Sequence, residues 1–425
     1  MILERKDKSK TNKALAHPPS KVTRGKPTSR MTGGTHTQVD SKQNQDRESP
    51  VDSTELDRFI RHFRTLVECE SPSMDHYALS QSARVHAAVG KELLGVAPRI
   101  ITVSDTPHLL WRFGTQPRKV VMIGHHDTVW PIGTLDTMPF AVNKGVITGP
   151  GTDDMKGGNL IALYAAARVQ KKLGSLDGLS IFINGDEELG SPSSRHLIET
   201  EAHGASAALV FESGGPDGEL KAARKGVALY GLNITGRAAH AGVEPERGIN
   251  ATVEAAHQIL TVERLNDPAV GTSVIPTAMH SGTTTNTVPA EAQLDIDSRA
   301  LTVAEQLRVD SALHSLTPHL PGAQVELTGG INRPPMEERS SRPLIELAQH
   351  IADSQGLPEV RPISVGGGSD GNFTAGIGVP TVDGLGTVGG GSHADDEHAL
   401  VDWIGPRTTL TAGMLEHLLT EGLPS

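Results

Sequence analysis

Residues 120–127 read VVMIGHHD, four apolar residues that run into a glycine, two histidines and an aspartate. Two later stretches repeat this theme: residues 179–188 read LSIFINGDEE, and residues 208–215 read ALVFESGG. Each stretch is typical of a buried strand that ends in a polar turn. Residues 157–173, between the first two strands, are expected to form a helix. Helices that alternate with apolar strands indicate an α/β fold, with a mostly parallel mixed sheet flanked by helices.

Further helices surround this centre. Apolar residues at helical spacing predict a helix over residues 53–67, and others are expected over residues 76–93 and 343–356. After the last of these helices, the pattern of strand and polar turn returns.

A different pattern interrupts the α/β region between residues 225 and 335. Residues 227–234 alternate between apolar and polar side chains, as a half-buried strand does. A helix over about 248–262 and strands near 273–280 and 291–299 follow. This segment is expected to be an inserted α+β unit with an antiparallel sheet.

Composition separates the first 50 residues from the rest of the chain. They contain 11 Lys and Arg against 5 Asp and Glu, whereas all 425 residues together have a formal net charge of −11. The segment lacks a hydrophobic period and is expected to be a disordered tail. Because the acidic remainder would repel phosphates, nucleic acid is not expected as a partner.

Two more exclusions come from the apolar runs and from cysteine. No stretch approaches the roughly 20 apolar residues that span a membrane, so no membrane partner is expected. Cys69 is the single cysteine, which excludes an internal disulfide and a cysteine-based metal site. One cysteine and no recognisable signal peptide together predict a cytoplasmic location.

The candidate site residues follow the predicted strands. His125 ends the first strand, and a neutral imidazole is a good zinc ligand. Asp127 stands two residues on, where a carboxylate can hold the other ring nitrogen of that histidine. Taken alone, this pair is better explained as an ordinary turn.

Acidic side chains supply further candidates. Asp153 and Asp154 lie in the glycine-rich stretch GPGTDDMKGG, where a carboxylate either bridges two cations or caps the following helix. Glu187 and Glu188 end an apolar strand, a costly place for two carboxylates unless they are paired or bind a metal. One of them can bind metal while its neighbour stays free as a base. A solvated turn is the alternative.

The last two candidates are Glu212, after the third strand, and His393, in the glycine-rich stretch GGGSHADDE. Helix capping by Ser392, Asp395 or Asp396 would explain the polar residues of that stretch but not its histidine. In open α/β sheets, ligands bind beyond the carboxyl ends of the strands. Two histidines and three carboxylates on predicted loops, without cysteine, therefore favour a two-zinc catalytic centre.

These motifs, in this order, resemble the zinc metallopeptidase family of carboxypeptidase G, acetylornithine deacetylase and succinyl-diaminopimelate desuccinylase. The likeness runs from about residue 55 to the C-terminus and is greatest for the carboxypeptidase G type. It implies two Zn²⁺ per subunit, with Co²⁺ or Mn²⁺ as alternatives because such ligands discriminate poorly. The implied ligands are His125 and Glu212 for one ion, Glu188 and His393 for the other, and Asp154 as the bridge.

The resemblance also assigns roles beside the metals. Asp127 would orient His125, and Glu187 would be the general base. A cis peptide bond is expected between Asp154 and Met155.

The inserted segment resembles the lid and dimerisation domain of the family and implies a homodimer. His240 would reach the active site of the partner subunit and stabilise the oxyanion, and Asn286 would contact substrate. Arg333 would grip a substrate carboxylate, since a guanidinium binds both carboxylate oxygens at once. Without the resemblance, His240 is better explained as a surface histidine, and Arg333 is also compatible with a solvated hinge. Gly367 and Gly368 would line the substrate pocket.

The implied activity is that of a carboxypeptidase. It would cleave an amide bond next to a free carboxylate and release a C-terminal amino acid, such as glutamate, from a small peptide or N-acyl conjugate. An N-acyl amino acid deacylase of the acetylornithine or desuccinylase type is the alternative, followed by a catalytically inactive binding relative. The expected division of the chain is a tail (1–50), a first catalytic part (51–224), the lid (225–335) and a second catalytic part (336–425).

Overall fold

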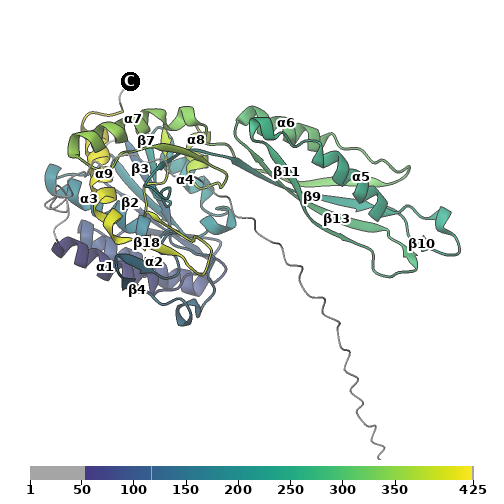
Figure 1. The fold of residues 1–425 in the computed structure, drawn as a ribbon, viewed down its shortest axis with the longest axis horizontal. Helices are drawn as coiled ribbons and strands as arrows, with labels where there is room; N and C mark the ends of the chain where they lie inside the picture. The colour runs from purple at the N-terminus through teal and green to yellow at the C-terminus, as the bar shows by residue number, and fades with distance from the viewer. Residues whose placement is uncertain (1–52, 116, 424–425) are drawn as a thin grey trace, which may run out of the picture. The chain divides into compact units, whose positions relative to one another are not determined.

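A computed structural model describes residues 53–115 and 117–423. The predicted tail, residues 1–50, lies outside the described residues. Two sheets, built from separate parts of the sequence, dominate the described fold (Figure 1). Among the described residues, no helix has both the length and the apolar character needed to cross a membrane.

The larger sheet has six strands in the order β1-β2-β6-β3-β7-β16. Its bounds are β1 Arg99–Val103, β2 Thr106–Arg112, β3 Val120–His125, β6 Leu179–Asn184, β7 Ala207–Val210 and β16 Thr381–Val382. Strands β6, β3, β7 and β16 run parallel, whereas β1 and β2 form an antiparallel edge. The register pairs His125 with Asn184, so β3 and β6 end side by side.

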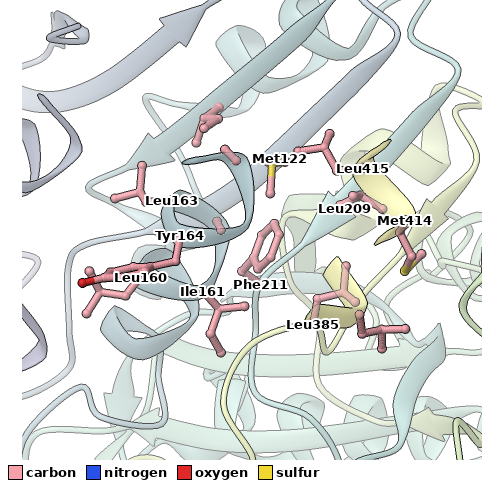
Figure 2. Packing of buried hydrophobic residues seen from close by; sticks show 14 of the residues in the cluster. Met122, Leu160, Ile161, Leu163, Tyr164, Leu209, Phe211, Leu385, Met414 and Leu415 are labelled. Atoms are coloured by element: carbon pink, nitrogen blue, oxygen red, sulfur yellow. The ribbon is translucent and has the colours of Figure 1, made fainter. Parts of the chain in front are cut away.

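Helices cover both faces of this sheet. They are α1 Ser53–Val67, α2 His76–Leu94, α3 Lys156–Leu173, α4 Arg195–Ala202, α7 Glu338–Gln355, α8 Gly371–Gly376 and α9 Val401–Thr420. Successive side chains of a strand point to opposite faces, and β3 divides its apolar residues accordingly. Val120 and Met122 enter the core with α1, α2, α3, α7 and α9, whereas Val121 and Ile123 enter the core with α4 and α8. Figure 2 shows Met122 in the first core, together with side chains of α3 and α9.

The smaller sheet is antiparallel, in the order β11-β13-β9-β14. Its bounds are β9 Gly226–Thr235, β11 Ser273–Ser281, β13 Glu291–Ala300 and β14 Gln324–Arg333. Helices α5 Ala251–Glu263 and α6 Val303–His314 lie against it (Figure 1) and enclose a separate core. The predicted fold class, a mixed α/β sheet with an α+β insertion, is therefore confirmed. The division of the chain into four domains stays a prediction.

Three smaller sheets connect the remaining strands. Strands β10 Ala239–His240 and β12 Thr287–Val288 pair within the insertion, and β8 Leu220–Arg224 pairs with β15 Pro362–Val365. A four-stranded sheet consists of β4 Ala141–Asn143, β5 Val146–Thr148, β17 Gly389–Gly390 and β18 His398–Leu400. Because β5 and β18 are antiparallel partners, the loop after β5 lies beside the loop before β18. These loops carry Asp154 and His393.

Two helices begin elsewhere than predicted. Helix α7 begins at Glu338 rather than residue 343, with Pro343 inside it. A proline inside a helix removes one backbone hydrogen bond, so the sequence favoured a start at the proline. Helix α5 begins at Ala251 rather than near residue 248, because the Asn250 side chain accepts hydrogen bonds from the first turn as an N-cap.

Candidate metal centre and substrate cavity

The site is built at the edge where the parallel strands end. His125 is the last residue of β3, and Glu187 and Glu188 lie in the turn after β6. Glu212 lies two residues beyond the end of β7. Because these strands are parallel neighbours, their side chains converge at one edge of the sheet.

The bridging candidate, Asp154, contacts both histidines. Its Oδ1 lies 3.0 Å from Nε2 of His125, and its Oδ2 lies 3.3 Å from Nε2 of His393. His125 also lies 3.7 Å from Oε1 of Glu212, and His393 lies 3.2 Å from Oε2 of Glu188. The structure thus brings all five predicted ligands together, with Asp154 between two histidine–glutamate pairs.

This donor set fits divalent cations. Each pair offers one imidazole nitrogen and carboxylate oxygens, the ligand types that zinc takes in catalytic sites. Oε1 of Glu188 is buried and has no hydrogen-bond partner among the described residues. A buried oxygen without a partner is costly, and a metal ion at this position would satisfy it.

Asp127 contacts both His125 and the acidic turn that follows β6. The Nδ1 atom of His125 lies 3.0 Å from the backbone oxygen of Asp127 and 3.4 Å from its carboxylate. The carboxylate itself accepts hydrogen bonds from the backbone N–H groups of Glu187 and Glu188, both at 3.2 Å, and from the Ser73 hydroxyl at 2.8 Å. Asp127 therefore connects the histidine to the acidic turn.

Glu187 and Arg333 form an ion pair, with Nη2 of the arginine 2.8 Å from Oε1 of the glutamate. Arg333 also donates from Nε to the backbone oxygen of Ser369 and lies 3.3 Å from the Asp370 carboxylate. Nη1 donates to the Asn332 side chain. Most of the guanidinium thus contacts protein groups in this structure.

Crowded carboxylates determine the electrostatics of the site. Burial, reinforced by the charge of Asp154, raises the pKa of Glu212 to about 8. Burial also raises the pKa of Glu187 well above its usual value, which the Arg333 cation offsets only in part. Hydrogen bonds to Asp154 and Glu188 raise the pKa of His393 to about 10. These side chains therefore bind protons in the metal-free protein, and divalent cations would replace those protons.

The pKa of His125 is raised in the same way as that of His393. Burial lowers the pKa of His125, but hydrogen bonds and charges of Asp127 and Asp154 raise it well above its usual value overall.

A cavity of about 530 Å³ opens onto these side chains. Gly367 and Gly368, for which substrate contact is predicted, line it, and Val227 and Leu229 of β9 add apolar surface. Several cationic side chains also line it. They are Lys221, Arg224, Arg299 and Arg333.

His240 and Asn286 lie together but outside this lining. The β10–β12 ladder pairs His240 with Thr287, and the backbone N–H of Ala241 donates to the backbone oxygen of Asn286 at 2.9 Å. His240 is exposed on the inserted segment. Neither residue is among the described residues that line the cavity.

The glycine-rich loops differ in part from their interpretation in the sequence. Helix capping by Ser392, Asp395 or Asp396 is wrong, because α9 begins only at Val401 and has no side-chain cap. Ser392 instead donates to Asp153 at 2.7 Å. The predicted cis peptide bond between Asp154 and Met155 is present.

Sequence reasoning missed several supporting residues. Glu397 accepts hydrogen bonds from the backbone around Asp154, and Asn159 donates to the backbone oxygen of His125 at 2.6 Å. The acid-rich run that ends in Glu397 was visible, but nothing in it distinguished this residue from its acidic neighbours.

Fold and site together define a metal-dependent hydrolase built on an α/β sheet. The chain belongs to peptidase family M20/M25/M40, whose family model matches residues 121–417. The predicted family and the prediction of an enzyme are thus confirmed.

Individual relatives show the range of this likeness. The chain is 33% identical over 292 residues to carboxypeptidase G2 of Pseudomonas sp. (strain RS-16). The matched region covers 66% of this chain and 69% of the relative. It is 30% identical over 356 residues to succinyl-diaminopimelate desuccinylase of Magnetococcus marinus, covering 77% and 90%. The solved YXEP protein of Bacillus subtilis, a dinuclear metal binding peptidase, has the same fold with a TM-score of 0.58, at 15% identity, covering 88% of this chain and all of that one.

Proposed function

We propose that the protein is a two-zinc carboxypeptidase that cleaves an amide bond next to a free carboxylate. The observation that carries this proposal is Asp154, whose two oxygens face His125 and His393 separately. That arrangement suits a bridge between two ions. The dinuclear metal binding peptidase of the same fold supports the number of ions.

The residues of this chain divide the chemistry between them. Bound zinc would supply a water of lowered pKa and polarise the scissile carbonyl. Glu187, whose pKa burial raises, would take the proton of that water and return it to the leaving nitrogen. Asp127 holds the backbone of Glu187 and so fixes where the base points.

Recognition of the substrate carboxylate is proposed for the cationic side of the cavity. Arg333 lines it with Gly367 and Gly368, and its Nη1 group donates to the Asn332 side chain rather than to Glu187. A small peptide or an N-acyl amino acid would place its carboxylate here. Release of a C-terminal residue such as glutamate is favoured by the 33% identity to carboxypeptidase G2.

A second candidate function is deacylation of an N-acyl amino acid. The desuccinylase of Magnetococcus marinus is 30% identical and is covered over 90% of its length, which favours this alternative. The bond cleaved is of the same kind, so the metal ligands suit both reactions.

We further propose a homodimer formed through the inserted segment. Leu260 of α5 and Ile275 and Met279 of β11 are exposed, which supports a contact there. His240, outside the cavity of its own subunit, would then stabilise the oxyanion in the partner's site. Light scattering of the purified protein tests the dimer, and a strictly monomeric active enzyme would exclude this role for His240.

The single cysteine supports a cytoplasmic location, which is likewise proposed.

A hydrolysis panel tests the activity. N-acyl glutamates, dipeptides and N-acetyl amino acids would be incubated with purified protein, with chelator, and with chelator followed by zinc. We expect release that chelator abolishes and zinc restores, with the best substrate separating the peptidase from the deacylase. A protein that binds zinc but releases nothing from any member would contradict the proposal and favour a binding relative.

A further inference from the structure

Two loops of the metal centre are joined through one buried carboxylate. Glu397 has no exposed surface, and its two oxygens accept four hydrogen bonds. Oε1 accepts from the backbone N–H groups of Asp153 at 2.9 Å and Asp154 at 3.0 Å. Oε2 accepts from the backbone N–H of Gly151 at 3.0 Å and from the indole of Trp130 at 2.7 Å. Three of the four donors therefore belong to the loop that carries the bridging aspartate.

The acceptor comes from the loop that carries the second histidine. Glu397 follows His393 by four residues, and the Ser392 hydroxyl adds a hydrogen bond to the Asp153 carboxylate. His393 itself has a half-exposed side chain and a left-handed backbone with φ of 63°. A half-exposed ligand on such a backbone has little packing to fix it, so the connections beside it determine where it lies.

We infer that Glu397 is a positioning residue that sets the separation between Asp154 and His393. It would thereby control the affinity for the ion held by His393 and Glu188. The inference rests on the proposed two-metal function. Hydrogen-bonded partners behind the ligands of a metal typically contribute 10–100-fold to its affinity.

Replacement of Glu397 by glutamine tests the inference, because it changes the hydrogen-bonding groups and keeps the size of the side chain. Each oxygen of Glu397 faces two N–H donors, so both must be acceptors. In the Glu397→Gln variant, the amide NH₂ has to face one of these donor pairs, while size and shape stay the same. Two donors then lose their acceptor, and the contact between the loops is broken without a cavity.

Glu254 offers a matched control in the inserted segment. It is also fully buried and also accepts hydrogen bonds from backbone N–H groups of a distant loop, those of His319 and Leu320. It is not one of the described residues that line the cavity. Glu254→Gln therefore reproduces the loss of a buried acceptor away from the metal centre.

The experiment is a titration of metal-free protein with Co²⁺, followed by visible absorption and by metal content after gel filtration. For Glu397→Gln we expect one of the two Co²⁺ affinities to fall 10–100-fold and the absorption spectrum to change, while Glu254→Gln matches the wild type. Wild-type affinities and spectrum in Glu397→Gln would overturn the inference. An equal loss in both variants would also overturn it, since it would show a general effect of destabilisation. A wild type that binds no Co²⁺ would instead refute the proposed function.

A milder variant covers the case in which Glu397→Gln does not fold. Trp130→Phe removes one donor to Oε2 and keeps an aromatic ring at that position. We expect a several-fold weakening of the same Co²⁺ affinity, and unchanged binding in this folded variant would overturn the inference.

Discussion

At the scale of single residues, Glu187 is the side chain on which turnover should depend most. It is mostly shielded from solvent beside the proposed metals, and the Asp127 carboxylate accepts a hydrogen bond from its backbone N–H. Glu187→Gln keeps the size of the side chain but removes its ability to accept a proton. Since general base catalysis contributes about 10²–10⁴-fold, kcat should fall by that order with both ions still bound. Steady-state kinetics with metal analysis measures this, and a near-normal kcat would exclude the role.

Arg333 connects two functions that kinetics can separate. Its side chain lines the cavity, where a substrate carboxylate is proposed, and it also pairs with Glu187 at 2.8 Å. Arg333→Lys keeps one charge but loses the planar fork. We expect KM to rise and kcat to fall, each by at least about tenfold, because both contacts are weakened. A rise in KM alone would show that the contact with Glu187 does not contribute to turnover. A fall in kcat alone would show that Arg333 does not bind the substrate carboxylate.

The predicted ligands illustrate what a sequence can reveal about a site. His125, Glu188 and Glu212 were found because each follows an apolar strand, and parallel strands bring their ends together whatever their order. The ion pair of Arg333 with Glu187 could not be predicted, since 146 residues separate the two. Such contacts depend on how the inserted segment meets the sheet, and no local pattern contains that information.

At the scale of elements, helix α3 packs closely against the end of β7, and this contact positions the loops of the site. A Cβ atom on Gly158 would lie 1.9 Å from the backbone oxygen of Phe211, next to the ligand Glu212. Gly158→Ala should therefore push helix and strand apart and lower the free energy of unfolding by about 1–3 kcal/mol. Gly366→Ala, with open space around its position, is the control and should change it by under about 0.5 kcal/mol. Urea unfolding compares the two, and equal effects would contradict this account.

At the scale of the whole molecule, periodicity was enough for the class of fold but not for its sheet order. The apolar runs at β3, β6 and β7 and the alternation in β9 predicted a mixed α/β sheet with an antiparallel insertion. The hairpin of β1 and β2, which forms the antiparallel edge, was missed because its residues lack a clear alternation. The order of parallel strands depends on crossovers between distant segments, which the sequence does not show directly.

The balance of protons in the metal centre makes the stability of the whole metal-free protein depend on pH. Glu212 has a pKa raised to about 8 by burial, against roughly 4.3 in an unfolded chain, and His393 has a pKa raised to about 10 by its hydrogen bonds, against roughly 6.5. Between about pH 6.5 and 8, the folded state therefore binds more protons than the unfolded state. Its stability must fall as pH rises through this window. Lys156, with a pKa lowered to about 8 by burial, opposes this trend only above the window.

Zinc should remove most of that dependence, because its charge replaces the protons that the cluster otherwise holds. For chelator-treated protein we expect Tm to decrease steadily from about pH 6.5 to 8, and for zinc-loaded protein we expect Tm to vary much less. The stabilisation by zinc should consequently grow with pH over this range. Calorimetry of both forms in matched buffers measures it. A metal-free Tm that rises across the window would mean that the buried carboxylates and histidines do not share protons as their contacts indicate.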